Sequence, residues 1–328
     1  MSLTLLDGSS TTTVPAEGLL LDAEALQAAT GWELKPQGLC RGDTCVPASL
    51  AAPVSLVEVA RLLGRPLVHH AVPDGAVAVL GEPAGVTLEP GSPAPPLTLQ
   101  DVDGRPVEIT SPGTKTAVVA WSTWCGCRYE LLAWKQLADE LRDEGLRVVT
   151  VALDDEPEGV RRWTQEGLPT AVDPEHRLSD LFGVVNVPAT VWLDEQGRVA
   201  KPPTIAPGDD RWKEWTQVDA AEHHDALRRW VRTGELPAVP GPVKDDEALR
   251  TARAERRLAA WLHRNGHPEA AEEHFAAAVA LAPLDFSIRR ASMPLRGQDP
   301  FGTEFFALWE EWDAAGRPGY TPTTQPSS

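Results

Sequence analysis

The sequence lacks an excess of basic residues, a long apolar run and a leader pattern, and each absence argues against a class of protein. Its 30 Lys and Arg residues face 48 Asp and Glu residues, whereas nucleic-acid-binding proteins concentrate basic residues. No apolar stretch approaches the ~20 residues that a membrane-spanning helix needs. Residues 1–18 have no basic segment followed by an apolar block, so we expect no secretory signal. We therefore expect a cytoplasmic protein without a nucleic-acid or membrane partner.

Cysteine is also scarce, with four residues in a chain of 328. In a cytosolic chain of this length, so few cysteines are more typical of catalysis or metal binding than of a disulfide scaffold. They form two close pairs, Cys40 with Cys45 and Cys125 with Cys127.

The remaining composition is that of an ordinary globular protein, with 42% hydrophobic and 24% charged residues. Composition and periodicity predict an α/β chain in successive parts. These parts are a small N-terminal α+β unit over residues 1–80, a Pro/Gly linker over 81–96, alternating strands and helices over 97–236, a helical extension over 244–318 and a disordered tail over 319–328.

Within these parts the apolar spacing predicts individual elements. In the first unit we expect helices over residues 19–29 and 55–63 and a hairpin that joins 66–70 to 76–80. In the second we expect a hairpin over 97–109, a strand that ends at 121, a helix over 128–144, a strand over 147–153, a helix over 158–166, a hairpin over 188–200, an irregular insertion over 201–217 and a helix over 220–231. The alternation predicts a largely parallel sheet.

The second cysteine pair lies where the expected strand ends and the expected helix begins. Unpaired backbone N–H groups at a helix start carry partial positive charge, which stabilises a thiolate, the reactive form of cysteine. The segment Cys125-Gly126-Cys127 therefore points to redox chemistry more strongly than any other part of the chain.

Residues 93–200 resemble the thioredoxin superfamily, and most of all its TlpA/ResA-like branch, which is related to the alkyl hydroperoxide reductase and thiol-specific antioxidant group. The segments that carry this resemblance are LTLQDVDGRPVEI (97–109), WSTWCGC (121–127), YELLAWKQLADEL (129–141) and VPATVWLDEQGRV (187–199). The resemblance implies a thioredoxin-like fold, a central mixed sheet with flanking helices. It also implies that Cys125 is the nucleophile, that Cys127 is its partner, and that Pro188 is a cis-proline lying against the active cysteine.

The motif departs from the family pattern in one respect, because WCGC is one residue shorter than WCxxC. Residues two apart in a helix do not face each other. A disulfide needs Cα atoms about 4.4–6.8 Å apart, so Cys125 and Cys127 meet this condition only if Cys125 stays in the loop as a helix cap. We expect either a strained, easily reduced pair or a resolving thiol elsewhere in the chain.

Cys40 and Cys45 are the candidates for that second redox pair, because the Gly42-Asp43 turn between them brings the thiols together. A relay would then pass electrons between this loop and Cys125. The alternatives are a structural zinc site completed by His69 or His70, and a free or structural cysteine pair.

Several other side chains have a functional and an ordinary interpretation. Glu130 is a candidate proton acceptor for the thiols, or a solvent-facing residue on a helix. Trp124 either shields the sulfur or simply packs. Asp154-Asp155 follows a strand end, where functional loops often lie, but an ordinary turn is favoured. His223-His224 is expected at a solvated helix start.

The helical extension contains the spacing of a tetratricopeptide repeat in a single copy. The residues at its packing positions are Leu258, Ala271, Phe275, Ala278 and Pro283. One repeat cannot bury its apolar face alone, so we expect it to pack on the redox domain or on a flanking helix near 301–315. These helices are also the expected binding site for a protein partner.

Three functions follow from these observations. The first is a thiol–disulfide oxidoreductase that acts on a protein or small-molecule disulfide, with no cofactor and with an electron donor that the sequence does not identify. The second is a thiol peroxidase of antioxidant type, for which Ser122 is correctly placed but Val118 or Val119 stands where peroxiredoxins have proline. The third is a non-catalytic adaptor, against which the retained Cys125, Cys127 and Pro188 argue.

Overall fold

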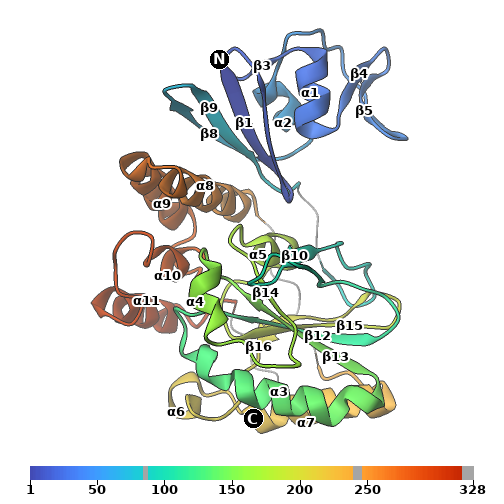
Figure 1. Ribbon diagram of the computed structural model, residues 1–328, viewed down its shortest axis with the longest axis vertical. Coiled ribbons are helices and arrows are strands. Elements are labelled where there is room, and N and C mark those ends of the chain that lie inside the picture. Colours follow the sequence, from blue (N-terminus) through green and yellow to red (C-terminus); the bar gives the residue numbers. More distant parts are fainter. Residues whose placement is uncertain (84–87, 239–245, 320–328) are drawn as a thin grey trace. The chain divides into compact units, whose positions relative to one another are not determined.

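A computed structural model describes residues 1–83, 88–238 and 246–319, and the chain divides into two compact units (Figure 1). The first unit is Met1–Val86 with Asp245–Pro283, and the second is Thr87–Lys244 with Leu284–Ser328. The helical segment expected as one extension over 244–318 is thus divided between the two units. The expected tail lies outside the described residues except for its first residue, and residues 84–87 of the expected linker over 81–96 also lie outside them.

The first unit is built on a sheet with the strand order β2-β1-β9-β8. Its strands are β1 (Ser2–Asp7), β2 (Ser10–Pro15), β8 (Leu67–Val72) and β9 (Gly75–Leu80). The β8–β9 hairpin confirms the prediction, and β1 pairs in parallel with β9. The β1–β2 hairpin was not predicted, because its Thr-rich second strand buries little beyond Val14.

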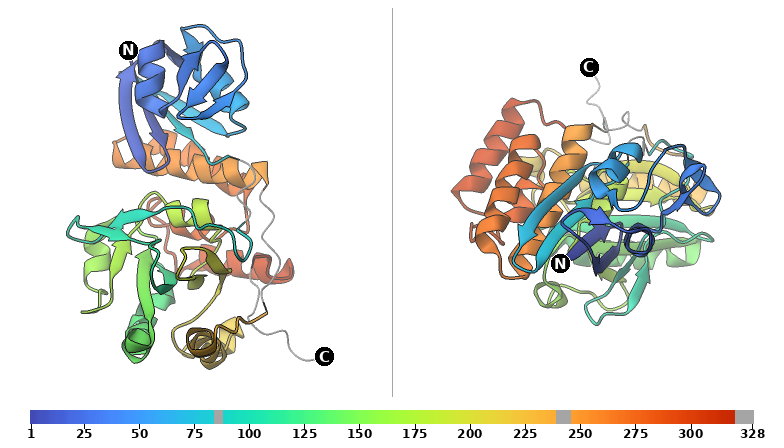
Figure 2. Two further views of the ribbon diagram at one scale, coloured as in Figure 1. Left: turned by 90° about the vertical axis from the view of Figure 1, so that its right-hand side faces the viewer. Right: turned by 90° about the horizontal axis from the view of Figure 1, so that it is seen from above.

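Helices cover both faces of this sheet. Helices α1 (Ala23–Thr30) and α2 (Leu56–Leu62) pack on one face, and α8 (Glu247–Arg264) lies along β8 and β9 with α9 (Pro268–Leu281) beside it (Figure 2). Helix α1 begins later than predicted because the preceding strand β3 (Leu20–Leu21) pairs with β7 (Val54–Ser55).

Helices α8 and α9 form an antiparallel pair with small and aromatic side chains buried between them. Leu258, Ala271, Phe275 and Ala278, which match the repeat pattern, are all buried. The pairing agrees with a helix–turn–helix unit, and its assignment as a tetratricopeptide repeat stays a prediction.

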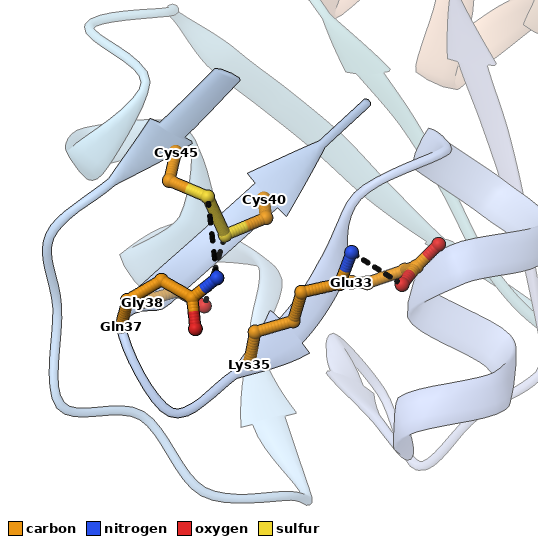
Figure 3. Close-up of a disulfide and its surroundings, with 6 residues drawn as sticks. All are labelled: Glu33, Lys35, Gln37, Gly38, Cys40 and Cys45. Carbon is orange, nitrogen blue, oxygen red and sulfur yellow. Dashed lines mark hydrogen bonds and ion pairs between the residues drawn. A yellow bond between two sulfur atoms is a disulfide. The ribbon is translucent and has the colours of Figure 1, made fainter. Parts of the chain in front are cut away.

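A small sheet of β4 (Glu33–Lys35), β5 (Gly38–Arg41) and β6 (Thr44–Val46) carries the first cysteine pair. Cys40 and Cys45 face each other in the β5–β6 register, and their sulfur atoms form a disulfide (Figure 3).

The second unit contains a mixed sheet with the order β11-β10-β14-β13-β12-β15-β16 (Figure 1). Its strands are β10 (Thr98–Gln100), β11 (Pro106–Glu108), β12 (Lys115–Trp121), β13 (Leu146–Ala152), β14 (Thr170–Val172), β15 (Ala189–Leu193) and β16 (Val199–Ile205). Strands β12, β13 and β14 are parallel, and β15 returns antiparallel beside β12. This is the central mixed sheet that the resemblance implies. The largely parallel sheet predicted from the alternation of strands and helices is wrong, because only the β12–β13 and β13–β14 pairings of this sheet are parallel and the other four are antiparallel.

Side chains of β12 alternate between the two faces of this sheet, as expected for a strand that is buried on both sides. Ala117 and Val119 pack with α3 (Leu131–Leu141) and α7 (Ala220–Thr233), while Val118 and Ala120 pack with α5 (Arg177–Phe182). The remaining short elements are η1 (Gly126–Glu130), η2 (Arg142–Glu144), α4 (Pro157–Arg161) and α6 (Lys213–Thr216).

Some of the predicted elements need correction. Strand β14 and helix α5 were not predicted, and α4 is shorter than the helix expected over 158–166. The expected irregular insertion begins later than residue 201, because β16 continues to Ile205 beside β15.

The C-terminal segment of the second unit contains α10 (Arg289–Ser292) and α11 (Thr303–Ala314). Its apolar side chains form a core together with residues of the insertion after β16. The members of that core include Ile205, Val218, Phe286, Met293, Phe305, Leu308 and Trp312.

Candidate active site

The second cysteine pair lies where β12 ends and the α3 segment begins. Cys125 has an extended backbone and occupies the N-cap position of η1, while Cys127 lies inside that helical turn. Cys125 therefore stays in the loop as a helix cap, which is the condition under which the shortened motif allows a Cys125–Cys127 disulfide. The two thiols are free in the structure and nearly inaccessible, with exposed fractions of 6% for Cys125 and 2% for Cys127.

The sulfur of Cys125 is held between its own motif and the segment before β15. The backbone N–H of Cys127 donates to Cys125 Sγ at 3.3 Å, and the Cys125 thiol donates to the carbonyl of Val187 at 3.5 Å. The Val187–Pro188 peptide is cis, as the resemblance implies. Residue 188 and the nucleophile candidate are thus neighbours.

The two thiols differ in acidity. Burial disfavours the thiolate of Cys125, but hydrogen bonds from Cys127 and the charges of Arg290 and Arg128 outweigh it and lower the pKa of Cys125 to about 7. Burial and the neighbouring Cys125 raise the pKa of Cys127 well above its usual range. Cys125 is therefore the thiol that ionises near neutral pH, and the thiolate is the nucleophile.

Glu130 is buried beside the thiols, so its interpretation as a solvent-facing residue is wrong. Its exposed fraction is 1%, and its Oε2 accepts a hydrogen bond from the backbone N–H of Gly208 at 2.8 Å. Burial raises the pKa of Glu130 to about 8, and nearby Cys125 and Asp209 act in the same direction. A carboxyl group with this pKa exchanges a proton near neutral pH.

Trp124 and Asp154 fix the loop that precedes the cysteines. The Trp124 indole is buried and donates to the carbonyl of Leu153 at 2.9 Å. Asp154 accepts hydrogen bonds from the backbone N–H of Thr123, at 2.9 Å, and from the Thr123 hydroxyl. Burial raises the pKa of Asp154 to about 6. Asp154 is therefore a buried anchor of the active-site loop, whereas we expected an ordinary turn.

Gly126, between the two cysteines, packs against an indole from the insertion after β16. A Cβ atom at residue 126 would lie only 2.8 Å from Cε2 of Trp212. A side chain at residue 126 would therefore force the Trp212 ring to shift.

Arg290 is the main site residue that sequence reasoning missed. It comes from α10, far from the motif in sequence, and is buried with an exposed fraction of 6%. Its guanidinium carbon lies 3.7 Å from the ring centre of Phe305, and its Nε donates to the carbonyl of Pro300 at 2.9 Å. No local pattern signals this arginine, because only the folded C-terminal segment brings it to Cys125.

A cavity of about 250 Å³ opens beside the two thiols. Its wall is made mainly of aromatic and apolar side chains from three parts of the second unit. The lining residues are Cys125, Gly126, Cys127, Glu130, Asn186, Val187, Pro188, Ile205, Pro207, Trp212, Trp215, Thr216, Phe286, Arg290, Phe301, Phe305, Phe306 and Trp309.

The other candidate residues lie elsewhere. Cys40 and Cys45 belong to the first unit, and sulfurs joined in a disulfide carry no thiolate for zinc. His70 instead contacts His274, with Nδ1 and Nε2 3.1 Å apart. Within residues 1–83, 88–238 and 246–319, no cluster of three His, Cys, Asp or Glu side chains is arranged to hold a metal ion.

The prediction of a solvated helix start is wrong for His223. This side chain is fully buried, with Nε2 3.3 Å from the hydroxyl of Thr190 and its ring packed on Trp134 and Trp192. It is a core residue of the α7 side of the sheet.

The fold and this site define a thioredoxin-like thiol–disulfide oxidoreductase. Residues 90–201 match the model of the AhpC/TSA family. The chain is similar to sporulation thiol-disulfide oxidoreductase A of Bacillus subtilis, with 23% identity over 144 residues that cover 41% of this chain and 87% of the relative. It is also similar to thiol-disulfide oxidoreductase ResA of Geobacillus thermodenitrificans, with 28% identity over 34% of this chain and 67% of the relative.

Solved structures are also similar to part of this chain. A putative thiol:disulfide interchange protein DsbE from Chlorobium tepidum is 26% identical over 35% of this chain and 84% of its own, with a TM-score of 0.33. A thioredoxin domain of a Bacteroides vulgatus thiol-disulfide oxidoreductase has a TM-score of 0.36 at 18% identity, over 44% of this chain and 99% of its own. Among the helices that the structure describes, none is long and apolar enough to cross a membrane.

Proposed function

We propose that the protein exchanges disulfides through Cys125, with Cys127 as the resolving thiol. The observation that carries this assignment is the asymmetry of the pair. Cys125, as the N-cap of η1, receives the N–H of Cys127, and its pKa falls to about 7, while burial holds Cys127 protonated. One thiol is thus prepared for attack and the other for the second step.

The reaction consumes the two electrons of the reduced pair. The Cys125 thiolate attacks one sulfur of a substrate disulfide, a mixed disulfide forms, and the other substrate sulfur leaves as a thiolate. Cys127 then loses its proton and attacks Cys125 Sγ, which releases the second substrate thiol and leaves a Cys125–Cys127 disulfide. The protein is oxidised and the substrate disulfide is reduced to two thiols.

Glu130 is the proposed acceptor for the Cys127 proton. Its carboxyl group is buried at the same site, its pKa is about 8, and the charge of Glu130 helps to raise the pKa of Cys127. The ionised fraction of Glu130, which grows as pH rises toward 8, is the form that accepts the proton. In the mixed disulfide Cys125 carries no charge, so it no longer raises the pKa of Cys127. Trp124 supports the reaction indirectly by fixing the loop, and Pro188 borders the sulfur.

A redox role for Cys40 and Cys45 fits a cytoplasmic location of the protein. Disulfides in a reducing compartment are usually transient and redox-active. The two cysteines face each other across β5 and β6 and form a disulfide within their own unit. We propose that this pair exchanges electrons with Cys125, and that a protein partner binds the helices after residue 244.

A thiol peroxidase is the second candidate, because the low pKa of Cys125 also suits attack on a peroxide. Reduction of insulin disulfides and consumption of hydrogen peroxide, each by wild type and by Cys125→Ser, separate the two functions. We expect wild type to reduce insulin and Cys125→Ser to be inactive. Activity on peroxide alone would replace the proposal with a peroxidase, and inactivity of wild type in both assays would leave a non-catalytic adaptor.

A further inference from the structure

The cavity beside Cys125 is completed by segments that lie outside the family match over residues 90–201. The insertion after β16 supplies Trp212 and Trp215, and the C-terminal segment supplies aromatic side chains that meet them. The Trp215 and Trp309 rings are 4.5 Å apart between centres, and Trp215 also contacts Phe305 and Phe306. The aromatic residues of this wall lie outside the part of the chain that matches the family.

The side chains that line the cavity favour apolar ligands. Arg290 is the cationic side chain of the lining, and its guanidinium is stacked on Phe305 and bonded to the carbonyl of Pro300. Glu130 is engaged by Gly208 and, with a pKa of about 8, is mostly uncharged at neutral pH. A ligand in the cavity therefore meets aromatic faces around a buried sulfur.

The backbone beside Pro188 is already occupied within the chain. Val187 donates its N–H to Asn186 Oδ1 at 2.8 Å, and its carbonyl accepts a hydrogen bond from Cys125 while that thiol is protonated. The carbonyl of Pro188 accepts the N–H of Ala206 at 3.2 Å. An extended peptide that adds to a sheet edge needs such groups for main-chain hydrogen bonds. These contacts disfavour an extended polypeptide as the group that lies against Pro188.

We infer that the cavity binds the apolar substituent of a low-molecular-weight disulfide and presents its sulfur to Cys125. This inference rests on the proposed disulfide exchange and narrows its substrate class. An apolar cavity of about 150 Å³ takes up benzene, so the 250 Å³ here accommodate a short alkyl or aryl group. Cys125 bonds to the sulfur that carries this group, and the other sulfur leaves as a thiolate. Cys127 then releases the bound group as a thiol, with both electrons supplied by the reduced cysteine pair.

The test compares the rates at which two small disulfides oxidise the protein. The two compounds differ in the terminal group at each end of the molecule. Dipropyl disulfide carries a methyl group where bis(2-hydroxyethyl) disulfide carries a hydroxyl. The reduced full-length protein is mixed with each compound and quenched with iodoacetamide, and oxidation is followed by mass spectrometry of the tryptic peptide 116–128, which holds both active-site cysteines. Each rate is divided by the rate of the same compound with dithiothreitol. We expect the normalised rate to be about tenfold higher for dipropyl disulfide, as an apolar pocket discriminates at this level.

Two exposed residues that line the cavity are replaced in the test variant, and an exposed residue outside the cavity is replaced in the control. Trp215 and Phe306 line the cavity with exposed fractions of 38% and 51%, so the double variant Trp215→Ser/Phe306→Ser is expected to fold. We expect it to lower the rate ratio toward one. Leu132→Ser on α3 removes a side chain of similar exposure, 57%, that does not line the cavity, and it should leave the ratio unchanged.

The outcomes separate this inference from the proposed function. A wild-type ratio near one, or an equal ratio in the double variant, overturns the apolar pocket while disulfide exchange stands. Faster reaction with insulin than with dipropyl disulfide also overturns it, in favour of a protein substrate. If the reduced protein reacts with none of these disulfides, the proposed function itself fails.

Discussion

The indole of Trp212 packs against Gly126 so closely that a Cβ atom at residue 126 would displace the ring. This contact joins the insertion after β16 to the turn that holds both cysteines. The single residue between the cysteines is therefore constrained by packing as well as by the geometry of the motif.

Gly126→Ala is expected to destabilise the protein by about 1–3 kcal/mol, the usual cost of forcing an extra methyl group into a packed contact. In a Trp212→Ala background the same substitution should cost much less, because the clashing ring is gone. Urea unfolding of the four proteins in a double-mutant cycle measures the difference. Equal costs in both backgrounds would show that this contact does not constrain Gly126.

Glu130→Gln is expected to change the pH dependence of stability. The folded pKa of Glu130 is raised from 4.5 to about 8, so its proton stabilises the folded state below about pH 4.5, and this contribution is lost as pH rises to about 8. Glutamine keeps an oxygen that accepts the N–H of Gly208 but carries no charge. The variant should therefore exceed wild type by about 2–4 kcal/mol at alkaline pH and approach it in acid.

Free energies of unfolding measured at mildly acidic, neutral and alkaline pH give that difference directly. Other buried carboxyl groups, such as Asp154, titrate equally in both proteins and cancel in the comparison. A difference that stays constant with pH would contradict the burial of an ionisable Glu130.

Arg290→Gln is expected to raise the pKa of Cys125 by about one unit, because a cation beside the thiolate is removed. Arg290→Lys keeps the charge and should restore much of the wild-type value. The measurement is the rate of iodoacetamide alkylation of Cys125 against pH, whose midpoint in wild type should fall near 7. A loss of stability alone would leave this midpoint unchanged, and an unchanged midpoint in Arg290→Gln would exclude a role for Arg290 in stabilising the thiolate.

The relay between the two cysteine pairs makes a separate prediction. With Cys45→Ser and Cys127→Ser combined, the remaining thiols Cys40 and Cys125 should be trapped as a mixed disulfide, within one chain or between two, when diamide is added as the two-electron oxidant. Peptide mapping without reduction identifies the linked peptides. The counterpart variants retain Cys45 in place of Cys40, Cys127 in place of Cys125, or both. If none of these variants yields a linked species, the relay hypothesis is wrong.

Local patterns were enough to predict much of the thioredoxin-like domain. The strand that ends at Trp121, the turn with both cysteines and the amphipathic α3 follow from apolar spacing and from the family segments. The hairpins β8–β9 and β10–β11 follow from turn residues between short apolar runs. In each of these elements the pattern is contained within a few residues of sequence.

Features that depend on distant segments could not be predicted in the same way. Arg290 and the aromatic wall reach Cys125 only because the C-terminal segment folds into the second unit. The charged side chain of Glu130 suggested an exposed helix face, yet Gly208 from the insertion covers and bonds it. His223 likewise lies in a polar stretch of sequence but is enclosed by two tryptophans from other elements.

The central claim is that Cys125 is the nucleophile of a disulfide exchange that Cys127 resolves. Cys127→Ser, reduced and mixed with bis(2-hydroxyethyl) disulfide, should accumulate a stable mixed disulfide on Cys125, which mass spectrometry of peptide 116–128 locates. Wild type should pass through this species to a Cys125–Cys127 disulfide, and Cys125→Ser should form neither. If the Cys127→Ser protein forms its adduct only at a cysteine other than Cys125, or forms none at all, the account is contradicted.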